Sequence, residues 1–219
     1  MIPEEILQDI AAQVKTCTRC KLYRSRKNAV PGSGSAETSI VFIGEGPGFH
    51  ENEQGLPFVG AAGQFLDELL AAAGLRREDV FITNVVKCRP PGNRDPQPDE
   101  LEACKVFLDR QIAAINPDVI VTLGRISMGK YIANGKISSI HGQSFWVNER
   151  MIIPMYHPAA ALHQPSLREV VKEDFARLPD LIAKAQEARG KQQQEEAANL
   201  AEVEEEPLED QTPKQLSLF

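Results

Sequence analysis

The feature that most constrains this chain is a glycine-rich turn that directly follows a short apolar run. Residues 40–43 (IVFI) have the length and β-branched content of a buried strand, and the sequence GEGPG follows at 44–48. Three glycines in five residues let the backbone take positive φ angles and approach a ligand closely. Open α/β folds place their binding crevice at such strand ends. The stretch therefore predicts a pocket, with a purely structural turn as the alternative.

Two common glycine-loop motifs do not fit this turn. The dinucleotide fingerprint needs a third glycine at position 49, where this chain has Phe49. The phosphate-binding loop needs Gly-Lys followed by Ser or Thr, and no Gly-Lys pair of this chain continues in that way. The pocket is therefore not assigned to a nucleotide cofactor.

Strand-like and helix-like segments alternate along the chain. The strand patterns cover residues 40–43, 80–86, 119–123 and 151–155, and the helix patterns cover residues 3–14, 63–74, 98–115, 125–133 and 167–188. Such alternation is typical of a parallel sheet with helices on both faces. We predict an α/β three-layer sandwich with a central four-stranded parallel sheet, plus a disordered acidic C-terminal tail.

The charge of the chain is concentrated at its end. The formal net charge is −7, and residues 191–219 hold eight acidic and two basic side chains, so the rest is almost neutral. This tail is rich in Gln, Ala and Glu and has too few large apolar residues to form a core. We expect a folded domain over residues 1–190 and a flexible acidic tail over residues 191–219.

The sequence gives no reason to expect a targeting signal. There is no apolar run long enough to span a membrane, and the acidic amino terminus lacks the basic-then-apolar layout of a secretion signal. A cytoplasmic protein without a membrane contact is expected, and disulfides are rare in the cytoplasm. The four cysteines therefore need another explanation.

The cysteines form a C-x2-C pair and two later single positions: Cys17, Cys20, Cys88 and Cys104. Three of them lie in turns beside basic residues such as Arg19, Lys87 and Arg89, and such neighbours are expected to lower a thiol pKa. The spacing favours a metal centre over four inert buried thiols. Both a structural zinc ion and an iron–sulfur cluster remain open on spacing alone.

Several motifs in a fixed order carry a resemblance to a known family. They are Gly44, Glu45, Gly46, Pro47 and Gly48 with Glu51, the turn GLPFVG at 55–60, Asn84, and His157 with Pro158. In this order they resemble the motifs of family 4 uracil-DNA glycosylases, over residues 17 to about 188. Family 1 enzymes carry a water-activating Asp at the position of Gly46, so the resemblance assigns no base there.

The resemblance implies an enzyme that flips uracil out of DNA and hydrolyses its N-glycosidic bond. The product is an abasic site, as in base excision repair. The implied catalytic residues are His157, Glu45 and Glu51. The implied substrate-binding residues are Gly44, Glu45, Gly46, Pro47, Phe58, Asn84 and His157.

Each implied role has a chemical reason. Phe58 offers a ring face for stacking, and Asn84 can pair with uracil O4 and N3–H while rejecting cytosine. The amides of Glu45 and Gly46, together with His157, are expected to hold the charge of the departing uracil. Glu51 is expected either to block the methyl group of thymine or to orient water.

The resemblance also implies a cofactor and contacts to DNA. Cys17, Cys20, Cys88 and Cys104 look like the ligands of a [4Fe-4S] cluster, which is expected to lie outside the chemistry and to fasten the amino-terminal segment to the body. Leu162 is expected to act as a wedge in the minor groove. The candidate phosphate contacts are Arg89, Arg94 and Arg168.

The last five residues have a character of their own. Gln215, Leu216, Ser217, Leu218 and Phe219 resemble the pentapeptide by which bacterial repair proteins bind the sliding clamp. Two leucines and a phenylalanine on a flexible tether would suit an apolar groove. A monomer is expected for the folded body.

The sequence also leaves alternative functions to the glycosylase hypothesis. One is a non-catalytic iron–sulfur or zinc DNA-binding protein. Another is a relative that traps uracil-DNA covalently. That relative carries an extra basic loop with a nucleophilic histidine, and no such insertion lies between Asn84 and Asp99.

Overall fold

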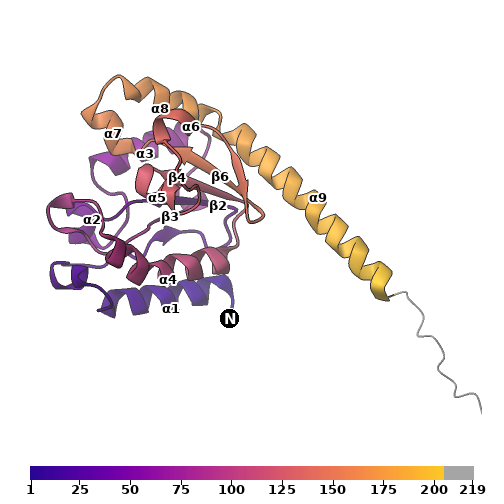
Figure 1. Ribbon diagram of the computed structural model, residues 1–219, viewed down its shortest axis with the longest axis horizontal. Helices are drawn as coiled ribbons and strands as arrows, with labels where there is room; N and C mark the ends of the chain where they lie inside the picture. The colour runs from indigo at the N-terminus through magenta and orange to yellow at the C-terminus, as the bar shows by residue number, and fades with distance from the viewer. Residues whose placement is uncertain (205–219) are drawn as a thin grey trace, which may run out of the picture.

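A sheet of six strands, covered by helices on both faces, forms the centre of the molecule (Figure 1). The computed structural model describes residues 1–204. In sheet order the strands are β1 (Ser33–Gly34), β3 (Phe81–Asn84), β2 (Ile40–Gly44), β4 (Val119–Leu123), β6 (Arg150–Met155) and β5 (Phe145–Val147). The α/β sandwich predicted from the sequence is confirmed.

The four central strands β3, β2, β4 and β6 are all parallel, as predicted. The sheet is wider than the predicted four strands because short antiparallel strands extend both edges. Strand β1 has two residues and β5 has three, too few to show a two-residue alternation. Their pairing depends on neighbours distant in sequence, or on the hairpin with β6, rather than on a local pattern.

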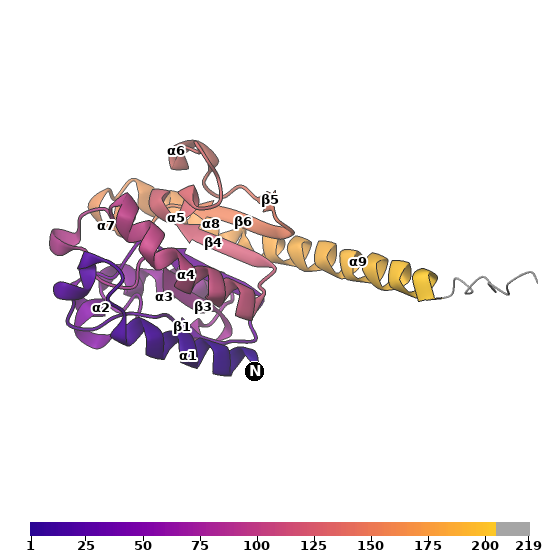
Figure 2. The ribbon, with the colours of Figure 1, turned by 60° about the horizontal axis from the view of Figure 1, so that its bottom comes forward.

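Two helical layers enclose the sheet. The helices are α1 (Pro3–Thr16), α2 (Phe49–Gln54), α3 (Ala61–Ala72), α4 (Pro98–Ile115), α5 (Arg125–Gly129), α6 (Ile137–Ile140), α7 (Pro158–His163), α8 (Leu167–Ala176) and α9 (Leu178–Glu204), with 3-10 turns η1 (Lys21–Arg24), η2 (Arg77–Asp79) and η3 (Pro91–Asn93). Helices α1 and α4 lie together over one sheet face, and α3 and α8 cover the other (Figure 2).

The strands supply a core to each layer because successive side chains point to opposite faces. In β2, Val41 and Ile43 pack toward α1 and α4, whereas Ile40 and Phe42 pack toward α3 and α8. All of these strand residues are buried. This two-sided burial explains why the strands read as continuous apolar runs.

The C-terminal helical region differs from its predicted form. The single helix predicted over residues 167–188 is divided at Arg177 into α8 and α9. Helix α9 then continues past position 190 to Glu204 and points away from the body (Figure 1). Gln, Ala and Glu are strong helix formers, so a segment too polar for a core can still be helical. The division into residues 1–190 and 191–219 stays a prediction, and the pentapeptide at 215–219 lies outside the described residues.

Residues 1–204 include no helix that is both long enough and apolar enough to cross a lipid bilayer.

Candidate active site

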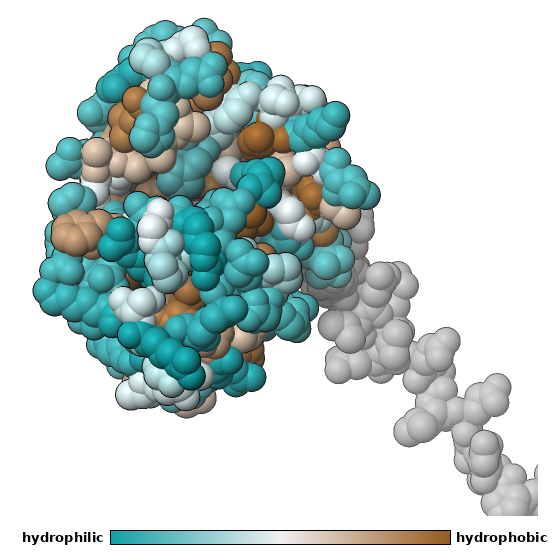
Figure 3. Space-filling model, turned by 60° about the vertical axis from the view of Figure 1, so that its left-hand side comes forward, coloured by the Kyte–Doolittle hydropathy of each residue, from teal (hydrophilic) through white to brown (hydrophobic). Residues whose placement is uncertain are grey.

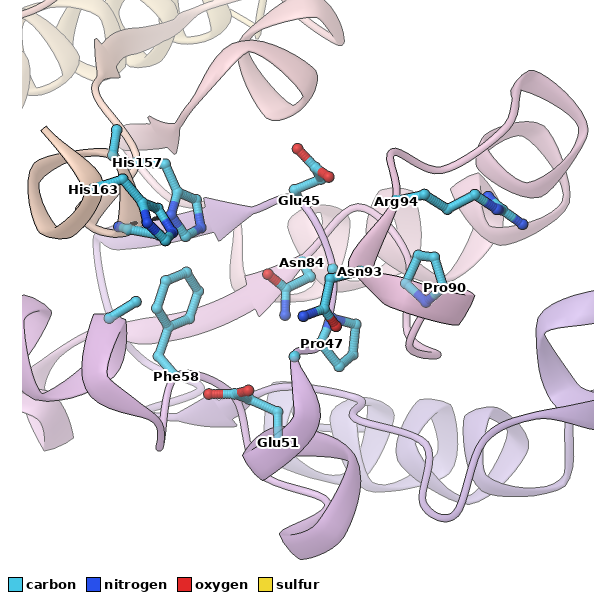
Figure 4. Close-up of a pocket in the computed structure, with 15 residues that line it drawn as sticks. Glu45, Pro47, Glu51, Phe58, Asn84, Pro90, Asn93, Arg94, His157 and His163 are labelled. Carbon is cyan, nitrogen blue, oxygen red and sulfur yellow. Dashed lines mark hydrogen bonds between the residues drawn. The ribbon is translucent and has the colours of Figure 1, made fainter.

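The ends of three parallel strands meet at one edge of the sheet. Gly44 and Asn84 are direct register partners at the ends of β2 and β3, and β6 ends two residues before His157. Beside them is a cavity of about 410 Å³ (Figure 4). All the predicted catalytic and substrate-binding residues except Gly44 line it: Glu45, Gly46, Pro47, Glu51, Phe58, Asn84 and His157.

Gly44 does not line the cavity but packs against two residues that do. A Cβ atom at this position would lie 2.4 Å from Asn84 Oδ1 and 2.6 Å from Phe58 Cζ. The positive φ angles expected for the glycine turn are wrong, because none of Gly44, Gly46 and Gly48 adopts one. A Cβ atom would instead come within 2.8 Å of a Val86 methyl group at Gly46 and within 2.7 Å of the Glu51 carboxylate at Gly48, so close neighbours favour glycine at both positions.

Phe58 and His157 form one wall of the cavity. Their rings stack with centroids 5.5 Å apart and planes 26° apart. Phe58 has a φ angle of 51°, in the left-handed region that non-glycine residues rarely occupy. Helix α3 packs against its carbonyl group so closely that only a glycine fits at Gly63. Tertiary packing therefore imposes this backbone strain on a cavity residue.

Glu51 holds the turn that carries Phe58. Its Oε1 accepts hydrogen bonds from the amides of Val59 at 2.8 Å and Gly60 at 2.9 Å. Its Oε2 lies over Gly48, 2.7 Å from where a Cβ atom would be. One carboxylate oxygen is thus engaged by the backbone, and the side chain joins the two glycine-rich turns.

Asn84 presents an unsatisfied amide to the cavity. The residue is only 2% exposed, and its Oδ1 has no hydrogen-bond partner within the described part of the chain. A buried polar atom without a partner is costly, so such atoms are usually explained by a ligand or water. The side chain of Asn84 therefore has the capacity to bind a polar edge inside the cavity.

A buried lysine lies directly behind Asn84. Lys87 is 1% exposed, and its Nζ donates hydrogen bonds to Asn84 O at 2.9 Å, Thr83 Oγ1 at 2.5 Å and Gln111 Oε1 at 2.6 Å. Burial lowers the pKa of Lys87 to about 7. From the sequence, Lys87 is only a basic neighbour of Cys88. In the structure its ammonium group hydrogen-bonds the end of β3, which carries Asn84.

His157 is held as a neutral imidazole. It caps helix α7, and its Nδ1 accepts a hydrogen bond from the amide of Ala159 at 3.1 Å. Burial lowers the pKa of His157 to about 4, against a smaller opposing effect of Glu51. Because Nδ1 is an acceptor, the ring proton resides on Nε2, which can donate a hydrogen bond.

Glu45 is the second carboxylate on the cavity, and it points away from Asn84 (Figure 4). It is half-buried. Burial raises its pKa, the charge of Asp95 raises it further, and Arg125 partly offsets both effects. Arg125 and Asp95 are paired with each other, with Nη2 and Oδ2 2.6 Å apart. A carboxylate with a raised pKa is a better proton acceptor near neutral pH.

The four cysteines come together on the α1 and α4 side of the sheet. Cys17 caps the end of α1, Cys20 precedes η1, Cys88 follows β3, and Cys104 lies on α4; all four line one small hollow. Donors point at the sulfurs: Arg26 Nη1 lies 3.3 Å from Cys88 Sγ, and the amide of Lys87 lies 3.3 Å from Cys104 Sγ. The sulfur atoms of three segments that are distant in the sequence thus lie around one hollow.

The expected effect of basic neighbours is wrong for two of the three turn cysteines, Cys20 and Cys88. Burial raises the pKa of Cys20 and Cys88, and it raises the pKa of Cys104 to about 11. The positive charge of Lys87 lowers the pKa of Cys104, but by less than burial raises it. Basic residues that are close in sequence therefore do not predict the pKa of these thiols, because burial raises it by more than the nearby charge lowers it.

The sulfur arrangement also bears on the kind of metal group. Within residues 1–204, no three His, Cys, Asp or Glu side chains are placed to hold a single metal ion. A tetrahedral zinc ion with Zn–S bonds of about 2.3 Å would bring its sulfurs to roughly 3.8 Å from one another. The hollow does not have that single-ion geometry.

Comparison with known proteins places the chain in a family. The family model of the uracil DNA glycosylase superfamily matches residues 31–178, which include the whole cavity-forming part of the sheet. The chain belongs to the uracil-DNA glycosylase superfamily. The predicted resemblance is confirmed.

Relatives of this superfamily member are type-4 uracil-DNA glycosylases. The Archaeoglobus fulgidus protein is 47% identical over 192 residues, which is 83% of this chain and 96% of the relative. The Thermotoga maritima protein is 46% identical over 83% of this chain and 97% of the relative. A type-5 uracil-DNA glycosylase of Thermus thermophilus is 38% identical over 48% of this chain and 54% of the relative. The type-4 similarity covers far more of the chain.

The cavity of this superfamily member has a further side that the sequence did not assign to it. Pro90, Asn93 and Arg94 line the cavity opposite His157 and His163 (Figure 4). The sequence feature that could have indicated this side is the basic, proline-rich loop at residues 87–94. Arg94 forms a bidentate pair with the buried carboxylate of Glu100, at 2.8 and 2.7 Å. Its guanidinium is therefore engaged by the protein before any phosphate arrives.

The other predicted DNA contacts differ in how far the protein already engages them. Arg168 pairs with Glu68 at 3.0 Å, whereas Arg89 has no acidic partner among the described residues. Leu162, on α7, is 39% exposed and available as a wedge. Figure 3, viewed from the α2 and α7 side, shows small apolar groups set among hydrophilic residues.

Proposed function

We propose that this chain is a monofunctional uracil-DNA glycosylase that extrudes uracil from DNA into the cavity of Figure 4. The observation that carries the proposal is the meeting of three different groups in one cavity: the ring of Phe58, the unsatisfied amide of Asn84 and the neutral imidazole of His157. Together they supply a stacking face, a base-reading edge and a donor for a leaving anion. Extrusion is needed because the glycosidic bond is inaccessible inside the stacked duplex.

Asn84 would select uracil by its edge. Its Oδ1 would accept a hydrogen bond from N3–H, and its Nδ2 would donate one to O4. Cytosine presents the reverse pattern at both atoms. Because Asn84 is buried, a wrong base would leave the amide without its partners, which makes discrimination strong.

Bond cleavage would generate a uracil anion and a cationic sugar. The C1′–N1 bond breaks and its electron pair goes to the base, where negative charge gathers on O2. His157 Nε2–H and the amides of Glu45 and Gly46 would stabilise that charge. Water then adds to C1′ and loses a proton, which yields free uracil and an abasic site.

Two carboxylates can receive the proton of the attacking water. Glu51 has Oε1 engaged by two backbone amides, so we assign it mainly to holding the Phe58 turn. Glu45 is half-buried and has a raised pKa, which suits it better as the base. Replacement of Glu45 by Gln should therefore slow the chemical step, whereas Glu51→Gln should mainly weaken substrate binding.

Cys17, Cys20, Cys88 and Cys104 would hold a [4Fe-4S] cluster. Four sulfurs from three segments line one hollow, and N–H donors point at three of them, Cys17, Cys88 and Cys104. Such a cluster supplies electron-transfer chemistry in many proteins, but no step of uracil release needs it. In this chain its ligands would tie α1, the Cys88 loop and α4 together.

The proposed setting is cytoplasmic DNA repair by a monomer that the tail delivers to DNA. Gln215, Leu216, Ser217, Leu218 and Phe219 would bind the bacterial sliding clamp and raise the local concentration of enzyme on new DNA. Deletion of these five residues should abolish clamp binding and leave turnover on short oligonucleotides intact. Loss of turnover in that variant would contradict this separation of roles.

The deciding experiment uses an oligonucleotide with one uracil. Incubation with the protein followed by alkali should cut the strand at uracil and leave a cytosine control intact. An absence of scission would reject the proposed glycosylase and favour a non-catalytic DNA-binding protein. A protein–DNA adduct that survives denaturation would instead indicate a covalent trap.

A further inference from the structure

An exposed aromatic residue and an arginine form a flat surface next to the cavity. Phe49, the first residue of α2, is 53% exposed, and the guanidinium of Arg89 lies over its ring, 5.4 Å from the centroid. The two residues come from different segments of the chain. Phe49 follows Gly48 and Arg89 precedes Pro90, and both of those neighbours line the cavity. We name the pair the Phe49–Arg89 platform.

Arg89 is held in place but keeps its charge available. Its Nε donates a hydrogen bond to Asn93 Oδ1 at 2.7 Å, and Asn93 itself lines the cavity. Among the described residues this is its one hydrogen bond, and no carboxylate pairs with it, in contrast to Arg94. The two terminal nitrogens of Arg89 are therefore free to bind an anion, while the planar group stays oriented.

The position of the platform suggests what it binds. A nucleotide whose base enters the cavity must carry its backbone across the cavity mouth, between α7 on one side and Gly48, Pro90 and Asn93 on the other. The platform continues directly from this second side. The next nucleotide of the strand, unstacked from the extruded one, would arrive there with a bare base face and a phosphate.

We propose that the Phe49–Arg89 platform binds the nucleotide adjacent to the extruded uracil, with Phe49 stacking on its base and Arg89 contacting its phosphate. The inference rests on the proposed function and adds a second, sequence-tolerant subsite to it, because every base has a π face. An isolated exposed cation–π pair would be a weak surface contact. The free guanidinium beside a cavity distinguishes this pair from such a contact.

The test uses single-stranded uracil oligonucleotides in three forms. One is unmodified, and the other two replace the 5′ or the 3′ neighbour of uracil by an abasic analogue. Phe49→Ala should lower kcat/KM for the unmodified strand by about 5- to 150-fold, the range of one base–aromatic stack. One of the two abasic strands should lower wild-type kcat/KM equally, and Phe49→Ala should cause no further loss on it.

Two variants separate stacking from other effects. Phe49→Tyr keeps the flat ring and should retain wild-type rates. Trp146→Ala removes an aromatic side chain of similar exposure, 51%, from β5 at the far edge of the sheet, and should change nothing. Arg89→Ala should reduce the slope of log affinity against log salt by about 0.7, the value for one phosphate on a single strand.

Unchanged kinetics in Phe49→Ala would overturn the proposal. So would a loss that persists on both abasic strands, since it would show that Phe49 shapes the cavity instead of binding a base. If the wild-type protein released no uracil, the proposed function would fail separately. Dissociation constants of the same three strands and variants, measured by fluorescence anisotropy, would then show whether the Phe49–Arg89 platform binds the neighbouring nucleotide.

Discussion

Phe58 and His157 stack on each other with their ring centroids 5.5 Å apart. A pyrimidine inserted between two parallel rings needs roughly 7 Å, which is two van der Waals contacts. The two residues therefore act as one wall against which a base lies, and not as two plates that enclose it. The stack also shields the imidazole from water, which contributes to its depressed pKa.

The low pKa of His157 predicts the pH dependence of the reaction. With a pKa of about 4, His157 is neutral at pH 5 to 8, so its donor role should give no inflection near 6.5. Single-turnover rates across pH 4 to 8 check this. Replacement of His157 by Ala should cost about 10²- to 10³-fold, and Gln, which keeps an N–H donor, should cost less. An inflection near pH 6.5 that disappears in the Gln variant would contradict a neutral His157.

The same pKa predicts how stability changes with pH. In the unfolded chain His157 binds a proton near pH 6.5, whereas in the folded protein it does so only near pH 4. The unfolded state therefore holds more protons in this interval, and stability falls as the pH drops from 6.5 toward 4. His157→Gln should flatten this slope, as denaturant titrations at several pH values would show. An unchanged slope would mean that the imidazole does not titrate differently on folding.

Removal of the Phe58 ring should affect both binding and the imidazole. Phe58→Ala is expected to weaken uracil binding and to raise the pKa of His157 toward its ordinary value, because water gains access to the ring. An NMR titration of the histidine ring protons would follow the pKa, and substrate titrations would follow binding. A pKa that stayed near 4 would show that other groups bury the imidazole.

Asn84 should control the choice of base. Replacement by Ala should lower kcat/KM for uracil by about 10- to 100-fold, because the buried edge of uracil loses its partners. Replacement by Asp removes the donor to O4 and should be at least as harmful. Parallel assays with uracil and cytosine strands measure selectivity, and thermal unfolding controls for folding. Full activity in the Ala variant would remove the role assigned to Asn84.

Gly44 should be intolerant of a methyl group. Gly44→Ala would place Cβ within 2.6 Å of both Phe58 and Asn84, so we expect about 1–3 kcal/mol of destabilisation together with slower uracil release. Gly129→Ala is the matched control, since nothing lies within 4 Å of its Cβ position and its φ is ordinary for a helix. Equal behaviour of the two variants in denaturant titrations would contradict the packing argument.

The sulfur ligands should link metal content to stability. Cys104→Ala is expected to lose iron and sulfide and to unfold at a lower temperature, because α4 would no longer be tied to α1. Val106→Ala, on the same helix, leaves the four sulfurs intact and should keep the iron. Iron and labile sulfide assays with thermal unfolding measure both effects. A full iron content in Cys104→Ala would exclude this residue as a ligand.

Much of the frame could be predicted because it depends on local patterns. Buried β-branched runs mark β2, β4 and β6, and Asn84, which ends β3, lies on the same cavity as His157, which follows β6. Parallel strands bring their carboxyl ends together, so position along the chain implies proximity in space. The motif order also indicated the superfamily, although the role of each residue remains a proposal.

What the sequence by itself determined is therefore the order of the four central strands, the edge where the cavity forms and most of the chemical groups available there. Only the tertiary structure decided how those groups are tuned: the close approaches that require Gly44, the burial that lowers the pKa of His157 and raises that of Cys104, and the pairing that engages Arg94 while it leaves Arg89 free. The physical reason is that desolvation and ion pairing depend on distances between residues far apart in the chain, which local patterns of polarity do not contain.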